Sequence, residues 1–321
     1  MRVIVVSQHG GADVLQPADM PPPQPGPGQL LVDLAAAGVN FMDIYQREGR
    51  PPYASNLPYV PGAEGAGTVV AVGPDVTGFA VGDRVAWTGA PGSYAEQVLV
   101  PAAAAVSVPG GMDLAAAAAV MLQGMTAHYL CYSTYPVAHG DPVVVHAAAG
   151  GVGLLLTQLA KLRGGQVIAT TSTDEKAALA RKAGADEVIG YDGFAQRVKE
   201  ISGEGAAAVY DGVGKATFLE GLDALRPFGR MILYGAASGQ PDPLEVATLA
   251  PKGSLYVQRP TLMTYARTPE LLHQRAGEVC ALIAEGKLHV RIGARYPLDQ
   301  ATQAHEDLEA RRTTGKLLLI P

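Results

Sequence analysis

Residues 146–161, which read His-Ala-Ala-Ala-Gly-Gly-Val-Gly-Leu-Leu-Leu-Thr-Gln-Leu-Ala-Lys, have the composition and spacing of a phosphate-binding turn. The β-branched run before them, residues 142–145, is typical of a buried strand, and apolar residues at helical spacing follow the glycines. Bare glycine backbone lets a pyrophosphate approach closely, and the N–H groups at the start of a helix favour an anion. The dinucleotide fingerprint G-x-G-x-x-G falls on Ala148, Gly150 and Gly153, so alanine replaces its first glycine. The stretch predicts a degenerate dinucleotide-binding turn; the alternative is a purely structural role for these small residues.

The chain after this turn alternates between strand and helix patterns, as the sheet carrying such a turn requires. A helix pattern runs from Asp174 to Gly184, and the strand patterns lie at residues 166–171, 187–189, 206–210, 230–234 and 254–257. Alternation at this spacing predicts a parallel sheet with right-handed crossovers. This context favours dinucleotide binding over the structural alternative.

The first 120 residues have a different pattern, with short alternating runs, much glycine and proline, and few helix patterns. Strands are expected at residues 30–34, 67–72 and 84–87, which together indicate a small β-barrel domain. The segments before and after the alternating strand–helix region predict helices at residues 114–120 and 269–285 and a last strand at residues 316–320. We expect this last strand to return to the first domain.

Length and composition exclude several classes of protein. The chain has 321 residues, 48% hydrophobic and 17% charged, which suits two domains with a large core. No apolar run is long enough to span a bilayer, and Met1 leads directly into a strand-like pattern, so neither a membrane partner nor export is expected. Cys131 and Cys280 form no C-x-x-C pair, which fits a reducing cytoplasm. The net charge of −6, without a Lys/Arg cluster, argues against a nucleic-acid partner.

Several short motifs, in this order and spacing, resemble the zinc-free quinone oxidoreductases related to zeta-crystallin, in the medium-chain dehydrogenase/reductase superfamily. The motifs lie at residues 38–45, 61–67, 82–85, 140–141, 148–153, 252–255 and 315–321. The resemblance implies an α/β fold, with an N-terminal GroES-like β-barrel catalytic domain and a Rossmann doubly wound parallel sheet. We expect the catalytic domain at residues 1–123, completed by 264–321, and the Rossmann NADPH-binding domain at residues 124–263.

The resemblance also bears on metal binding. Zinc alcohol dehydrogenases of the superfamily place Cys, His and Cys in three motifs; the corresponding places here hold Asn40 or a near neighbour, Ala63 and Gln123. None of these is a good zinc ligand. The structural zinc lobe needs four cysteines, the chain has two, and its seven histidines are scattered. No zinc is therefore expected.

The segment after the second predicted strand indicates which nicotinamide cofactor is bound. An NAD enzyme usually carries Asp or Glu there to bind the ribose 2′-hydroxyl, whereas residues 171–173 are Thr-Ser-Thr. Ser172, Lys176 and Tyr191 can surround a 2′-phosphate, and the resemblance adds Arg311 as a basic contact. The alternative for Lys176 is a solvated helix charge. Together these features predict NADPH.

The resemblance places the nicotinamide in a cleft between the two domains, with Asn40 and Tyr45 beside it and the substrate. An Asn amide can donate a hydrogen bond to a developing oxyanion, and a Tyr can donate or stack on a flat quinone; the alternative is a satisfied polar group. Tyr53 and Arg259 are weaker substrate candidates, and no general base is evident. The predicted cofactor contacts are Asn40, Phe41, Tyr45, Gln123, Thr126, Tyr129, Ala149, Gly150, Gly151, Val152, Gly153, Ser172, Lys176, Tyr191, Gly212, Tyr234, Gly235, Ala236, Ser238 and Arg311.

The activity that the resemblance implies is NADPH-dependent reduction of quinones or related conjugated carbonyls without zinc. Two alternatives remain open: an NADPH-dependent enoyl or alkenal reductase, and an NADPH-regulated binding protein with slight catalysis. Residues 255–257 would leave an apolar sheet edge, and such edges are usually covered or paired. As in the family, a homodimer through that edge is expected.

Overall fold

A six-stranded parallel sheet carries the glycine turn, as the alternation of strand and helix patterns predicts. Its order is β10-β9-β8-β11-β12-β13, and every neighbouring pair is parallel. The strands are β8 (Pro142–Val145), β9 (Gln166–Thr170), β10 (Glu187–Ile189), β11 (Ala206–Asp211), β12 (Leu225–Leu233) and β13 (Tyr256–Gln258). The chain winds outward from β8 in both directions, so β8 and its neighbours form the switch point at which doubly wound sheets bind ligands.

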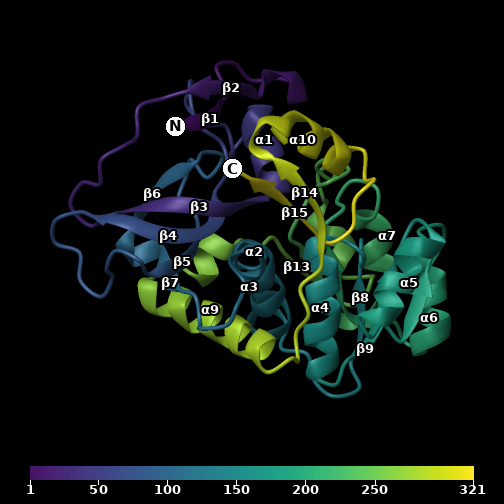
Figure 1. Cartoon of the computed structure of the whole chain (residues 1–321). Coiled ribbons are helices and arrows are strands. Elements are labelled where there is room, and N and C mark those ends of the chain that lie inside the picture. Colours follow the sequence, from purple (N-terminus) through teal and green to yellow (C-terminus); the bar gives the residue numbers. More distant parts are fainter. The chain divides into compact units, whose positions relative to one another are not determined.

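The computed structural model describes residues 1–321, and the chain divides into unit 1 (residues 1–122 and 266–321) and unit 2 (residues 123–265). The expected domain limits differ from these by one and two residues. The helices that connect the strands of unit 2 are α4 (Gly151–Leu162), α5 (Asp174–Lys182), α6 (Phe194–Ser202) and α7 (Phe218–Asp223). Shorter or flanking elements are α3 (Met121–Tyr129), a π-helical segment (Leu130–Thr134), a 3₁₀ turn (Val246–Leu249) and α8 (Leu262–Tyr265). Figure 1 shows these elements in teal and green.

Unit 1 is built on a seven-stranded, mostly antiparallel sheet. Its order is β14-β15-β3-β4-β5-β7, and β6 also pairs with β3. These strands are β3 (Gln29–Val39), β4 (Glu64–Val72), β5 (Arg84–Thr88), β6 (Gln97–Pro101), β7 (Ala105–Ser107), β14 (Ile292–Pro297) and β15 (Lys316–Ile320), and β1 (Arg2–Val5) pairs separately with β2 (Gln16–Asp19). The last strand returns to this unit as expected, because β15 pairs with β3. Trp87 and Tyr94 are fully buried in its core.

The helices of unit 1 include two that the sequence patterns did not predict. Helices were expected at 114–120 and 269–285, and the structure has α2 (Leu114–Ala118) and α9 (Pro269–Ala284) there. The unpredicted helices are α1 (Phe41–Arg47) and α10 (Ala301–Glu309), which lie side by side in Figure 1. The Arg47 guanidinium and His305 Nδ1, 3.2 Å apart, join them. Three short 3₁₀ turns complete the unit: Ala12–Val14, Ala102–Ala104 and Leu298–Gln300. No helix in the structure is both long and apolar enough to cross a membrane.

Candidate functional site

The glycine turn after β8 leaves the start of α4 bare. Gly150 is the N-cap of α4, and no side chain caps the helix. Ala147 has a positive φ of 50°, and its N–H donates to the Tyr191 hydroxyl at 3.0 Å, so Tyr191 lies against the glycine turn. A Cβ on Gly153 would lie 2.7 Å from the Cα of Ala148, closer than real Cβ atoms approach backbone. Gly153 therefore allows the close helix–strand packing that the last glycine of a dinucleotide fingerprint provides.

The three residues 171–173 between β9 and α5 are hydroxyl-bearing and include no carboxylate, whereas the first turn of α5 carries Asp174 and Glu175 before Lys176. The Lys176 ammonium lies 3.5 Å from the Ser172 hydroxyl, and Thr173 caps α5 by accepting the N–H of Lys176 at 3.3 Å. Beneath the turn, the buried His146 ring lies 2.8 Å from the Thr170 hydroxyl, and burial lowers the pKa of His146 to about 3. The imidazole is therefore neutral at neutral pH and adds no charge to this region.

The loops after β11 and β12 are joined by hydrogen bonds, which brings the predicted residues Gly212, Tyr234, Gly235, Ala236 and Ser238 together. A Cβ on Gly212 would lie 2.8 Å from the Tyr234 hydroxyl, and one on Gly235 would lie 2.7 Å from the Gly212 carbonyl oxygen. The Ser238 hydroxyl donates to the Val213 carbonyl at 2.8 Å and accepts the Ala216 N–H at 3.0 Å. Ser238 thus holds the two loops against each other, and any contact with a cofactor would add to that role.

A buried carboxylate at the end of β11 fixes the same loops. Asp211 accepts the N–H groups of Val213 and Gly214 at 2.7 and 2.9 Å and the Thr217 hydroxyl at 2.8 Å. Burial raises the pKa of Asp211. Because parallel strands end at one edge of a sheet, this loop, the glycine turn and the end of β9 share the edge at which a dinucleotide binds.

Helix α3 carries three of the predicted cofactor contacts: Gln123, Thr126 and Tyr129. A Cβ on Gly151 would overlap the Gln123 amide, so this side chain packs directly on the glycine turn. The Tyr129 ring stacks on Tyr265 with centroids 4.3 Å apart, and the Tyr265 hydroxyl accepts from Gln258 at 3.1 Å. Thr126 is buried on the same helix. Arg259, a weaker substrate candidate, donates to the Leu233 carbonyl at 3.0 Å.

In unit 1, Asn40 belongs to a buried ionic cluster that the sequence did not reveal. Its Nδ2 donates to Glu64 at 2.9 Å and to the Gly38 carbonyl at 3.3 Å, and its Oδ1 accepts from Lys316 at 2.7 Å. Lys316 also pairs with Glu64 at 2.5 Å, and the second Glu64 oxygen accepts the Leu122 N–H at 2.6 Å. Both amide hydrogens of Asn40 are thus engaged within the unit. A hydrogen bond from Asn40 to an oxyanion would replace one of them, so we propose that Asn40 positions α1.

A second polar network extends the cluster along α1. Asp43 accepts the Asn40 N–H at 2.8 Å and the Tyr94 hydroxyl at 3.0 Å, and burial raises the pKa of Asp43 to about 7. The Tyr94 hydroxyl also lies 3.0 Å from His305 Nε2. Burial and the Arg47 charge lower the pKa of His305 to about 3. Helix α1 is therefore held by buried polar contacts at both ends.

Helix α1 and the loop after it carry an aromatic group, in which Tyr45 is buried and Phe41 and Tyr53 are partly exposed. The Tyr45 ring lies 6.3 Å from Phe41 and 5.4 Å from Tyr53, both tilted. Flat aromatic faces of this kind suit a conjugated ring, which packs by offset or tilted stacking. Tyr53, a weaker candidate from the sequence, is therefore placed with Tyr45.

The residues of unit 2 fit a phosphorylated nicotinamide dinucleotide. The start of α4 is uncapped, a Cβ at Gly190 would meet nothing within 4 Å, and residues 171–173 after β9 include no carboxylate. A groove of about 460 Å³ beside α6 is lined by Ile189 and Arg197 among others and contains none of the predicted site residues. Arg311 belongs to unit 1, where it follows α10 with a positive φ of 57°. Its contact with the phosphate stays a proposal.

The structure has no group of three or more His, Cys, Asp or Glu side chains that could hold a metal ion. Near Asn40 and Ala63, the positions compared above with zinc ligands, the Lys316 ammonium lies between the oxygens of Asn40 and Glu64. These two oxygen atoms thus already contact a side-chain cation.

Two family models match the chain: an alcohol dehydrogenase GroES-like domain at residues 26–110 and a zinc-binding dehydrogenase at residues 151–276. A quinone oxidoreductase of Pseudomonas aeruginosa is 46% identical, with 99% of each chain covered. A 2-haloacrylate reductase of Burkholderia is 40% identical, covering 99% of this chain and 98% of its own. The structure of Escherichia coli quinone oxidoreductase complexed with NADPH matches with a TM-score of 0.97 at 40% identity, covering 100% of both chains.

Proposed function

Because this chain belongs to the quinone oxidoreductases of the medium-chain dehydrogenase/reductase superfamily, we propose that it is a zinc-independent, NADPH-dependent quinone reductase. The observation that carries the proposal is the edge of the unit 2 sheet, where an uncapped glycine turn lies beside residues 171–173, which include no carboxylate. The NADPH-bound relative, which matches over the whole chain, supports the same cofactor.

The residues of this chain supply binding and orientation. NADPH, when bound, supplies the hydride. The start of α4 would hold the pyrophosphate, and Ser172, Lys176 and Tyr191 would hold the 2′-phosphate. Tyr45 and Tyr53 would hold a flat acceptor, and holding cofactor and acceptor in line accounts for most of the rate that such a reaction needs.

Turnover with NADPH and NADH tests the cofactor assignment. Chelator-treated protein should reduce small quinones with NADPH, and Lys176→Ala should raise the KM for NADPH about tenfold, because a charge-assisted contact to phosphate contributes about 1.5 kcal/mol. The KM for NADH should not change. Lys182→Ala, at the far end of α5, is the control. Loss of activity on chelation, or an equal effect of Lys176→Ala on both cofactors, would contradict the proposal.

A reductase of activated alkenes is the second candidate, favoured by the similarity to the 2-haloacrylate reductase. Comparing a quinone with a haloacrylate under the same conditions separates the two, because only the alkene reductase needs a proton delivered to carbon.

A homodimer through the edge of the unit 2 sheet is also proposed. In β13, which pairs only with β12, Tyr256 is 56% and Val257 38% exposed, while Leu255 is buried and belongs to the core. Val257→Lys should therefore shift the sedimenting species to the monomer, whereas Leu219→Lys, on an exposed residue of α7, should not. A wild-type protein that sediments as a monomer would refute this assembly.

A cytoplasmic location, which cell fractionation would check, is proposed from the two buried, unpaired cysteines.

A further inference from the structure

The guanidinium of Arg50 lies over the ring of Tyr45, one of the proposed acceptor contacts. Its central carbon is 5.2 Å from the ring centroid, within the range of a cation–π contact. Arg50 lies three residues beyond α1, and its N–H donates to the Tyr45 carbonyl at 2.9 Å. The backbone therefore brings this side chain back over the last turn of the helix.

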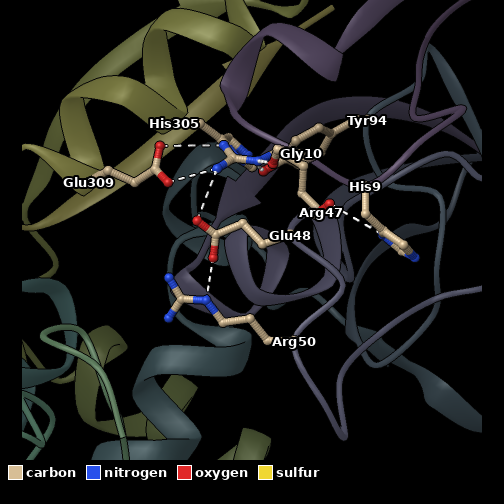
Figure 2. A network of polar contacts seen from close by, with 8 residues as sticks. All are labelled: His9, Gly10, Arg47, Glu48, Arg50, Tyr94, His305 and Glu309. Carbon is tan, nitrogen blue, oxygen red and sulfur yellow. Dashed lines mark hydrogen bonds and ion pairs between the residues drawn. The ribbon is translucent and has the colours of Figure 1, made fainter.

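A chain of ion pairs holds Arg50 in this place (Figure 2). Glu48 pairs with the Nε of Arg50 and, at 3.6 Å, with Arg47. The Arg47 side chain is 1% exposed and is itself fixed by Glu309 at 2.7 Å and by His305 at 3.2 Å. Because Arg47, at the other end of this chain of ion pairs, is buried, Arg50 is restrained more strongly than a surface arginine of similar exposure.

The two terminal nitrogens of Arg50 remain available. Glu48 pairs with Nε, no hydrogen bond from either terminal nitrogen is seen, and the side chain is 45% exposed. Two parallel N–H groups on a planar guanidinium are the donor set that binds a carboxylate in bidentate fashion. Glu48 balances the charge of Arg50 from the Nε side, so the positive end of the pair lies at the terminal nitrogens.

We propose that Arg50 is a specificity-determining residue that favours conjugated acceptors carrying a carboxylate over neutral ones. This inference rests on the proposed reductase function. An acceptor ring packed against Tyr53, the partly exposed member of the Tyr45–Tyr53 pair, would have its substituents near the guanidinium, because that cation lies on the ring that Tyr53 contacts. The ring contacts bind any flat acceptor, and the guanidinium discriminates by charge.

The test compares a neutral naphthoquinone with a naphthoquinone that carries a carboxylate, in wild type, Arg50→Gln, Arg50→Lys and Arg197→Gln. Arg197 is the matched control, an exposed arginine of unit 2 that pairs with Glu200. Arg50→Gln should lower kcat/KM about tenfold for the carboxylate-bearing quinone and less than about twofold for the neutral one. Arg50→Lys should keep part of the preference, and Arg197→Gln all of it. In wild type, added salt should reduce the preference.

For each quinone, kcat/KM of the variant is divided by kcat/KM of wild type. This ratio cancels the effect that the different reduction potentials of the two quinones have on the rate. An equal loss for both quinones in Arg50→Gln would overturn the inference, because Arg50 would then support only the packing of Tyr45. No loss for either would overturn it as well. If wild type reduces neither quinone with NADPH, the proposed function itself fails, which is a separate outcome from a changed ratio.

Discussion

Replacing Lys316 with methionine is expected to lower the free energy of unfolding by about 3–5 kcal/mol, because it leaves a buried carboxylate without its cation. Glu64 is completely buried, and Lys316 is 2% exposed. The ammonium lies 2.5 Å from Glu64 and 2.7 Å from Asn40. Its loss leaves the Glu64 carboxylate with only neutral donors, the Asn40 amide and the Leu122 N–H. Urea unfolding of both proteins at one pH measures the difference.

Two further variants show whether the loss of stability in Lys316→Met comes from the lost charge or from lost packing. Lys316→Met combined with Glu64→Gln removes both charges with little change in volume and should recover most of the loss. Lys287→Met removes an exposed lysine that pairs with Glu285 at 2.8 Å and should change stability by less than about 1 kcal/mol. A double variant as unstable as Lys316→Met alone would show that the methylene packing of Lys316, rather than its charge, is what the fold needs.

The same cluster explains why part of the site was not predictable from the sequence. Residue types at fixed local spacing revealed the glycine turn and the parallel sheet, since both depend on neighbours within about 20 residues. Asn40, Glu64 and Lys316 come from segments far apart in the chain, and only the pairing of β15 with β3 brings Lys316 to Asn40. A charged residue at the start of the apolar run 316–320 was the one available signal.

Helix α1 was missed for a related reason. It has only seven residues, several of them aromatic or β-branched, and such a helix is stabilised by its surroundings rather than by intrinsic propensity. Asn40 followed three residues later by Asp43 is a capping signal that could have identified its start. The contacts of Arg47 that fix its other end involve α10, over 250 residues away in sequence, and no local pattern encodes them.

The second large effect is expected at the glycine turn, where Gly153→Ala should weaken NADPH binding at least about tenfold and lower stability by about 2–3 kcal/mol. The new methyl group would meet backbone rather than a flexible side chain, at 2.7 Å from the Ala148 Cα and 2.9 Å from its carbonyl carbon. The turn would have to move away from α4, and the Ala147–Tyr191 hydrogen bond of 3.0 Å would move with it.

Gly277→Ala is the matched control for Gly153→Ala, since both glycines lie inside α-helices. A Cβ at Gly277, in α9, would meet nothing within 4 Å, so this variant should be neutral or more stable by about 0.5–1 kcal/mol. Urea unfolding and NADPH titration by fluorescence, applied to both variants, separate the general effect of a glycine replacement from the effect at the turn. If Gly153→Ala binds NADPH as tightly as Gly277→Ala, the dinucleotide does not depend on the close packing of α4 against the turn. The assignment of residues 146–153 as its binding site would then be wrong.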